Sequence, residues 1–139
     1  MKVMVFVKAS RESEAGEKPS RKLLEEMTAF NEALAEAGVM IEGEGLHPSV
    51  RGVRVHFDGE ARTVSDGPFA ELKEVVAGYW LWEVESMAEA IEWARKCPNP
   101  TGDSGQLELR PVFGPEDLGE DFTPELQERN EKIRARTPG

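Results

Sequence analysis

The sequence predicts an α+β fold in which two βαβ units flank a β-hairpin, with one further helix at the C-terminus. Two short runs, residues 3–7 and 76–84, are rich in β-branched and aromatic residues and are apolar on both strand faces. Two other stretches repeat apolar residues at helical spacing. Asp58 and Gly59 form a strong two-residue hairpin turn between alternating segments.

The chain opens with the first strand, in residues 3–7. Three valines lie on one of its faces, and Met4 and Phe6 lie on the other. A strand that is apolar on both faces is typical of the centre of a covered sheet. Residues 9–18 are polar and contain a glycine, so we expect a loop there.

A helix and a second strand follow. Pro19 suits the first turn of a helix. Residues 23–37 then carry Leu, Met, Phe, Leu and Ala at helical spacing, and Gly38 provides a left-handed cap. Residues 39–46 predict a second strand that contains two glycines.

The predicted hairpin pairs residues 53–57 with residues 61–65. Val53, Val55 and Phe57 alternate with polar residues, so we expect these three side chains to face the core. The opposite face of the strand is polar, which indicates a solvated surface.

The second half repeats the plan of the first. Residues 66–74 predict a loop with one helical turn, and residues 76–84 predict a strand. Ser86 and Glu89 have the spacing of a capping box, which predicts the start of the second helix. Residues 106–111 alternate again and give the last strand.

This order is that of a ferredoxin-like βαβ-βαβ domain with an inserted hairpin, spanning residues 1–112. Two helices cover one face of the sheet. The strands at residues 3–7 and 76–84 are apolar on the other face as well, and the chain has no further layer to cover it. A second copy of the sheet would do so, and we therefore expect a homodimer.

Residues 113–139 lie outside that plan and form a C-terminal extension. Thr123 and Pro124 provide a cap and a first-turn proline, so we expect a helix from about residue 122 to 136. Its apolar edge is thin, which predicts that the helix docks on the domain or on a partner. That edge consists of Phe122, Leu126 and Ile133.

The charge and the cysteine and histidine content of the chain disfavour several classes of partner and ligand. The formal net charge of -10 disfavours binding to DNA or RNA. The one cysteine, Cys97, precludes an intrachain disulfide, and with two histidines the chain offers no zinc site, so we expect no metal. The apolar N-terminus is too short for a membrane span, and we expect a cytoplasmic protein. We expect Cys97 to be a packing residue.

The run Asp66-Gly67-Pro68-Phe69, with Lys73-Glu74 and Gly78-Tyr79 behind it, resembles the motif of the DGPF family of YCII-related proteins. Residues 43–46, Gly-Glu-Gly-Leu, are similar to the family's other marked stretch. The resemblance covers roughly residues 2–112 and implies a dimeric α+β barrel. YCII-related proteins are suspected enzymes because of a His and Asp pair. This chain has no histidine in its first helix, so that pair is not carried over.

Asp66 and His47 are the candidate catalytic residues. Asp66 either caps the turn by accepting backbone N–H bonds or serves as a base or anchor at the mouth of the barrel. His47 follows two glycines at a strand exit, where a histidine can titrate near neutral pH. Candidate ligand-binding residues complete the set: Lys73, Glu71, Tyr79, Trp80, Trp82, His56 and Arg54.

Two functions remain open from the sequence. One is a small-molecule site in a barrel cavity near Asp66, enzymatic or not, with no cofactor motif to indicate a reaction. The other is a non-enzymatic accessory module, because DGPF proteins are commonly associated with extracytoplasmic-function sigma factors. A pocket containing Asp66 and an aromatic wall would favour the first. An exposed apolar stripe on the last helix would favour the second.

Overall fold

The computed structural model describes residues 1–100 and 105–137. Four strands form an antiparallel sheet in the order β2-β5-β1-β6, with β5 and β1 in the centre. The strands of this sheet are β1 (Lys2–Lys8), β2 (Met40–Gly45), β5 (Val76–Glu83) and β6 (Leu107–Pro111). The predicted order of elements is confirmed.

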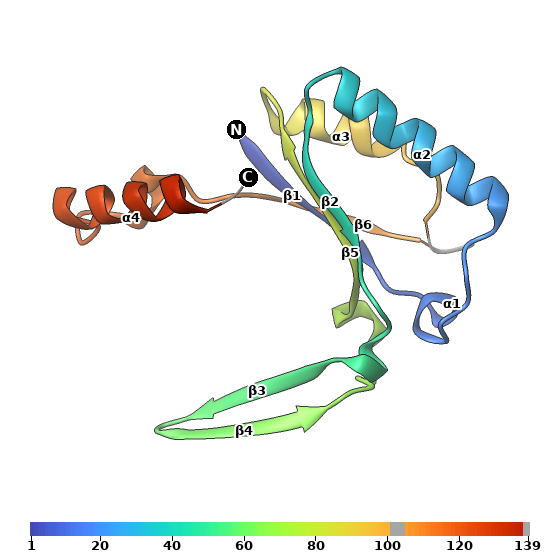
Figure 1. The fold of residues 1–139 in the computed structure, drawn as a ribbon, viewed down its shortest axis with the longest axis horizontal. Helices are drawn as coiled ribbons and strands as arrows, with labels where there is room; N and C mark the ends of the chain where they lie inside the picture. The colour runs from blue at the N-terminus through green and yellow to red at the C-terminus, as the bar shows by residue number, and fades with distance from the viewer. Residues whose placement is uncertain (101–104, 138–139) are drawn as a thin grey trace.

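Helices α2 (Arg21–Glu36) and α3 (Met87–Arg95) cover one face of this sheet (Figure 1). Ser86 caps α3 by accepting from the backbone N–H of Glu89, as its spacing predicted. A short helix, α1 (Arg11–Glu14), occupies part of the expected loop, because Ser10 and Ser13 bond reciprocally in a capping box.

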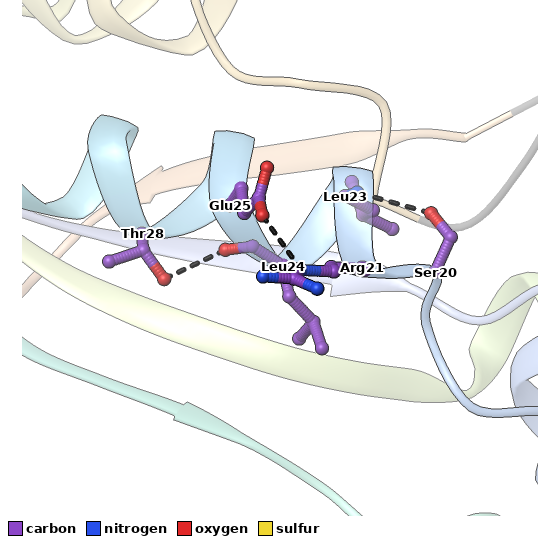
Figure 2. A network of polar contacts seen from close by, with 6 residues as sticks. All are labelled: Ser20, Arg21, Leu23, Leu24, Glu25 and Thr28. Carbon is purple, nitrogen blue, oxygen red and sulfur yellow. Dashed lines mark hydrogen bonds and ion pairs between the residues drawn. The ribbon is translucent and has the colours of Figure 1, made fainter.

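Figure 2 shows how the first turns of α2 are held. The Ser20 hydroxyl accepts from the backbone N–H of Leu23, at 3.1 Å, and so caps the helix. One turn on, Arg21 pairs with Glu25 at 3.0 Å, and the Thr28 hydroxyl donates to the Leu24 carbonyl. These polar groups leave the apolar stripe of the helix to face the sheet.

The core lies between the sheet and the two helices. Trp82 and Leu34 are fully buried there, and Phe30 meets the rings of both Trp80 and Trp82 edge-on. The valines of β1 supply the middle of the layer. Burying each large apolar side chain stabilises the fold by about 1.5–3 kcal/mol.

The other face of the same strands is open. Met4 and Phe6 of β1 and Tyr79 and Leu81 of β5 alternate with the core residues, and all four remain partly exposed. The register places Phe6 opposite Tyr79 and Met4 opposite Leu81, so the four side chains form one patch, the open-face patch.

The hairpin of β3 (Val53–Asp58) and β4 (Ala61–Asp66) is a separate two-stranded sheet that extends away from the body (Figure 1). The strand assignments are confirmed. The prediction that Val53, Val55 and Phe57 face the core is wrong, because the hairpin does not join the main sheet and Phe57 is 73% exposed. The alternation marks an apolar face that this chain does not cover itself.

The C-terminal extension ends in helix α4 (Pro124–Arg136), capped by Thr123 as expected. It lies on the side of the sheet opposite α2 and α3 (Figure 1). None of its residues is buried, and Leu126 and Ile133 are exposed. Within this chain α4 therefore has no covered edge.

Candidate functional site

A cleft of about 450 Å³ lies on the helix-covered side of the sheet. The segment around α1 and the first half of α2 form one wall, and β2 and β5 form the other. The side chains and backbone that line it include Ser13, Lys18, Met27, Asn31, residues 43–48, Ala77, Gly78, Tyr79 and Trp80. A volume of this size is typical of a small-molecule site.

Glycines shape the sheet wall of the cleft. A Cβ on Gly43 would lie 2.6 Å from Cδ1 of Trp80, so a glycine at this position lets the indole approach β2 this closely. A Cβ on Gly78 would lie 3.0 Å from the Glu44 carbonyl oxygen, which explains the close approach of β2 and β5. A Cβ on Gly45 would meet nothing within 4 Å, so Gly45 opens onto free space.

Trp80 is the aromatic wall of the cleft. Its Nε1 donates to Oδ1 of Asn31 at 2.9 Å, and its ring packs edge-on against Phe30 with 5.8 Å between centroids. The indole is therefore held from the helix side and from the core. A fixed aromatic face suits contact with a planar apolar molecule.

Tyr79 contributes to the cleft edge but bonds elsewhere. Its hydroxyl donates to Oε1 of Glu42 at 2.5 Å. This hydrogen bond, followed by partial desolvation, raises the pKa of Tyr79 above its ordinary value.

His47 stands at the end of β2, where the cleft meets solvent. Its Nε2 lies 2.9 Å from Nη1 of Arg51. A guanidinium only donates, so Nε2 accepts in this contact and the imidazole carries its proton on Nδ1. His47 thus presents an N–H donor, while Arg51 fixes its ring.

Ser49, two residues beyond His47, is a buried polar residue that ties three segments together. Its backbone N–H and its hydroxyl both donate to the carboxylate of Glu14 on α1. Its Oγ accepts from the backbone N–H of Phe69 at 3.0 Å. The turn that follows His47 is therefore held from both sides, by α1 and by the Asp-Gly-Pro-Phe segment.

The Asp-Gly-Pro-Phe segment packs directly on this turn. The Gly67 N–H donates to the Gly52 carbonyl at 2.9 Å, and a side chain on Gly67 would collide with the carbonyl oxygen of Ser49. The peptide bond between Gly67 and Pro68 is cis. The Phe69 ring lies beneath the Arg54 guanidinium, 3.8 Å from it. The motif supports the wall that carries His47.

Asp66 itself is exposed and does not line the cleft. Among the described residues its carboxylate has no hydrogen-bond or ion-pair partner. The prediction that it accepts bonds from backbone amides in the bend is wrong. The nearby amides are already taken, by the carbonyl of Gly52 and by the hydroxyl of Ser49.

Three of the nine predicted site residues line the cleft: His47, Tyr79 and Trp80. The others lie elsewhere. Trp82 is completely buried in the core, because it follows Trp80 on the same strand face but lies deeper under the helices. Glu71 and Lys73 are exposed on a 3₁₀ turn outside the cleft.

The remaining two, Arg54 and His56, lie on the polar face of the hairpin. Arg54 covers the Phe69 ring, and Nε2 of His56 lies 2.8 Å from the Ser65 hydroxyl. This places both residues in contacts of the hairpin and its base, outside the cleft.

Sequence reasoning missed Asn31 and Lys18. Asn31 was recognisable, since it is a polar residue within the apolar stripe of α2, one position after the buried Phe30. Lys18 had no such signal, because it lies in the polar segment whose course over the sheet only the fold reveals.

Cys97 packs against the core, as expected, and its thiol donates to the Pro98 carbonyl. Burial raises the pKa of Cys97 to about 11, so the thiol stays protonated and is a poor nucleophile at neutral pH.

Within residues 1–100 and 105–137, no three His, Cys, Asp or Glu side chains are grouped to hold a metal ion. No helix in that part of the chain is long and apolar enough to span a membrane.

Comparison with known proteins identifies the family of this chain, a relative and similar solved structures. An uncharacterised protein of Rhizobium meliloti, R00369, is 30% identical over 91 residues, covering 66% of this chain and 73% of that protein. The solved structure of 5-chloro-2-hydroxyhydroquinone dehydrochlorinase (TftG) from Burkholderia phenoliruptrix, in complex with 2,5-dihydroxybenzoquinone, is similar at 16% identity and a TM-score of 0.44. It covers 84% of this chain and 98% of TftG. The YCII-related domain matches residues 1–115. The chain therefore belongs to the YCII-related domain family.

Proposed function

We propose that the protein binds a small planar molecule in the cleft between α1, α2 and strands β2 and β5. The observation that carries this is the cleft of about 450 Å³ walled by Trp80 and by the glycine-rich residues 43–46. Trp80 is 6% exposed, so only a small part of the indole borders the cleft, and Asn31 fixes its orientation there. Preformed walls reduce the ordering that a ligand must impose.

The chemistry around the cleft favours a ligand of one or two rings with a polar substituent. Trp80 supplies a face for the ring. Lys18 and the free N–H of His47 are donors for an oxygen on the ligand. If the protein carries out a reaction, His47 is the candidate acid and base group, since its imidazole lines the cleft.

We also propose that two copies pair through the open-face patch. Met4, Phe6, Tyr79 and Leu81 are contiguous and partly exposed, although each lies on a central strand. A second sheet packed on this patch would bury them at about 25 cal/mol per Å² of apolar surface. The cleft lies on the opposite face, so pairing would leave it accessible.

A second candidate function is an accessory module that binds a protein of an extracytoplasmic-function sigma factor system. The exposed apolar edge of α4, with Leu126 and Ile133, favours it. Gel filtration of the chain with the cognate sigma factor checks this candidate. Separate elution of the two proteins at micromolar concentration would rule it out.

The ligand proposal is tested with naphthalene-2-sulfonate, a planar two-ring fluorescent probe with one anionic substituent. Gly45→Leu places a side chain on the wall of the cleft, at a position where a Cβ meets nothing within 4 Å. Thr28→Leu adds the same side chain on the outer surface of α2 and serves as the control. We expect the probe affinity to fall at least tenfold in Gly45→Leu and to be unchanged in Thr28→Leu. Equal affinities in the two variants would contradict the proposal.

A further inference from the structure

Two parts of the chain extend from the body on the side of the open-face patch: the β3–β4 hairpin and the C-terminal arm, residues 113–136 (Figure 1). Both expose large apolar side chains. On the hairpin, about half or more of the surface of four side chains is exposed: Val53, Val55, Phe57 and Val64. The exposed apolar residues of the arm are Phe113, Leu118, Leu126 and Ile133.

The surface of the chain is too large for an isolated monomer. Its accessible area is 10428 Å², whereas a compact folded chain of 15.4 kDa exposes about 7,200 Å². The excess is several times the roughly 800 Å² that one partner buries in a standard protein interface. The two extending parts account for it, because neither packs on the core.

The arm is strongly acidic, and the hairpin carries one arginine, Arg62, on its apolar face. The register places Arg62 opposite Phe57 and Asp66 opposite Val53 on the apolar face of the hairpin, whereas Arg54 lies on the polar face. Residues 113–128 contain no Lys or Arg but contain six acids: Glu116, Asp117, Glu120, Asp121, Glu125 and Glu128.

These charges are largely unpaired within the chain. Among the described residues, none of Arg51, Arg54 and Arg62 has an acidic partner within 4.0 Å, and the arm's first five acids have no basic partner. Glu128 pairs with Lys132 of its own helix. Both surfaces thus expose apolar side chains that this chain does not cover, and Arg62 offers the acidic arm a basic partner on the hairpin face.

We propose that the C-terminal arm of one copy lies on the apolar face of the β3–β4 hairpin of a second copy. The contact rests on the proposed pairing through the open-face patch and extends it at both ends. The YCII-related domain ends at residue 115, before α4 begins, so the arm is an addition to the family's domain. In an isologous dimer the contact occurs twice, which doubles the area that it covers.

Cross-linking between single-cysteine chains tests the contact. In a Cys97→Ala background, one full-length chain carries Val55→Cys on the hairpin, and a second chain with an affinity tag carries Leu126→Cys on α4. The two are mixed to equilibrium and treated with a bismaleimide that has a flexible spacer. Leu24→Cys, exposed on α2 on the opposite side of the sheet, replaces Leu126→Cys in the control.

We expect the tagged–untagged product to form at least tenfold more from the Val55 and Leu126 pair than from the control pair. A second sample carries both cysteines in one chain, and it should give mainly products of two chains. A one-chain product would show that the arm folds onto its own hairpin and would overturn the proposal. Dimers by gel filtration without the hairpin–arm product would also overturn it, while the proposed pairing would stand. Monomers by gel filtration would instead refute the pairing.

Discussion

The two faces of the central sheet are built from the same strands, but the chain covers only one of them with helices. On β1, Val3 and Val5 are fully buried under the helices, while Met4 and Phe6, the residues between them, stay partly exposed. On β5, Trp80 and Trp82 are buried and Leu81 is not. Apolar alternation in the sequence therefore predicts that a face of the sheet is covered, but it does not predict which element or molecule covers it.

The largest expected effect on stability comes from replacing a leucine by alanine on each of the two faces of the sheet. Leu34→Ala removes a fully buried side chain from the covered face and should lower the free energy of unfolding by about 2–5 kcal/mol at any protein concentration. Leu81→Ala removes a side chain of the open-face patch. Its effect should depend on protein concentration, because it acts through association. Urea unfolding at two concentrations measures both, and a concentration-independent loss in Leu81→Ala would break the distinction.

The next largest effect on stability is expected from substitutions of the glycines in the wall of the cleft. Gly43→Ala places a methyl group 2.6 Å from Trp80 and 2.9 Å from Met40, and should cost about 1–3 kcal/mol of stability through overpacking. Gly45→Ala, two residues on and in the same strand, meets nothing and should change stability little. Thermal unfolding compares the two. Equal melting temperatures would mean that the indole does not lie against Gly43.

A smaller effect concerns Cys97, which packs at the edge of the covered face. Its folded pKa of about 11 is above the ordinary value of 9.0, so the folded state holds the proton more tightly. The stability that it contributes is fully present below about pH 9 and is lost as the pH rises toward 11. Wild type should therefore lose stability over this interval more steeply than Cys97→Ala, measured by urea unfolding. Parallel pH profiles would contradict the burial of the thiol.

The smallest effect is expected at Asp66. Its carboxylate is exposed and has no partner among the described residues, so Asp66→Asn and Asp66→Ala should both change the unfolding free energy by less than about 0.5 kcal/mol. The probe affinity of the cleft should also be unchanged, because Asp66 does not line it. A loss of 1 kcal/mol or more in Asp66→Ala alone would show that the side chain caps the turn after all.

Sequence periodicity predicted the elements well because local signals decide them. Ser86 and Thr123 cap their helices where expected. The hairpin turn lies one residue later than predicted, at Gly59-Glu60, because Asp58 still pairs with Ala61. The side chains of Val53, Val55 and Phe57 were misplaced for a different reason. Their alternation is genuine, but whether a hairpin joins the main sheet depends on contacts far away in the chain.

The candidate site was only partly predictable. His47 and Trp80 stood out by residue type and neighbours, and both line the cleft, whereas Tyr79 reaches only its edge and points its side chain to the other face. Asp66 drew attention through its motif, yet the structural contacts of that motif come from Gly67 and Phe69, which hold Ser49 and the turn after His47. A motif shows that a segment is constrained, and only the fold shows which of its atoms carry the constraint.

The contrast between the two faces is tested most directly by the mass of the native protein in solution. Light scattering at micromolar concentration should give about twice the chain mass of 15.4 kDa. Phe6→Lys, which places a charge in the open-face patch, should give the one-chain mass and keep a cooperative unfolding transition. A one-chain mass for the wild type would contradict the account, and so would a two-chain mass for Phe6→Lys.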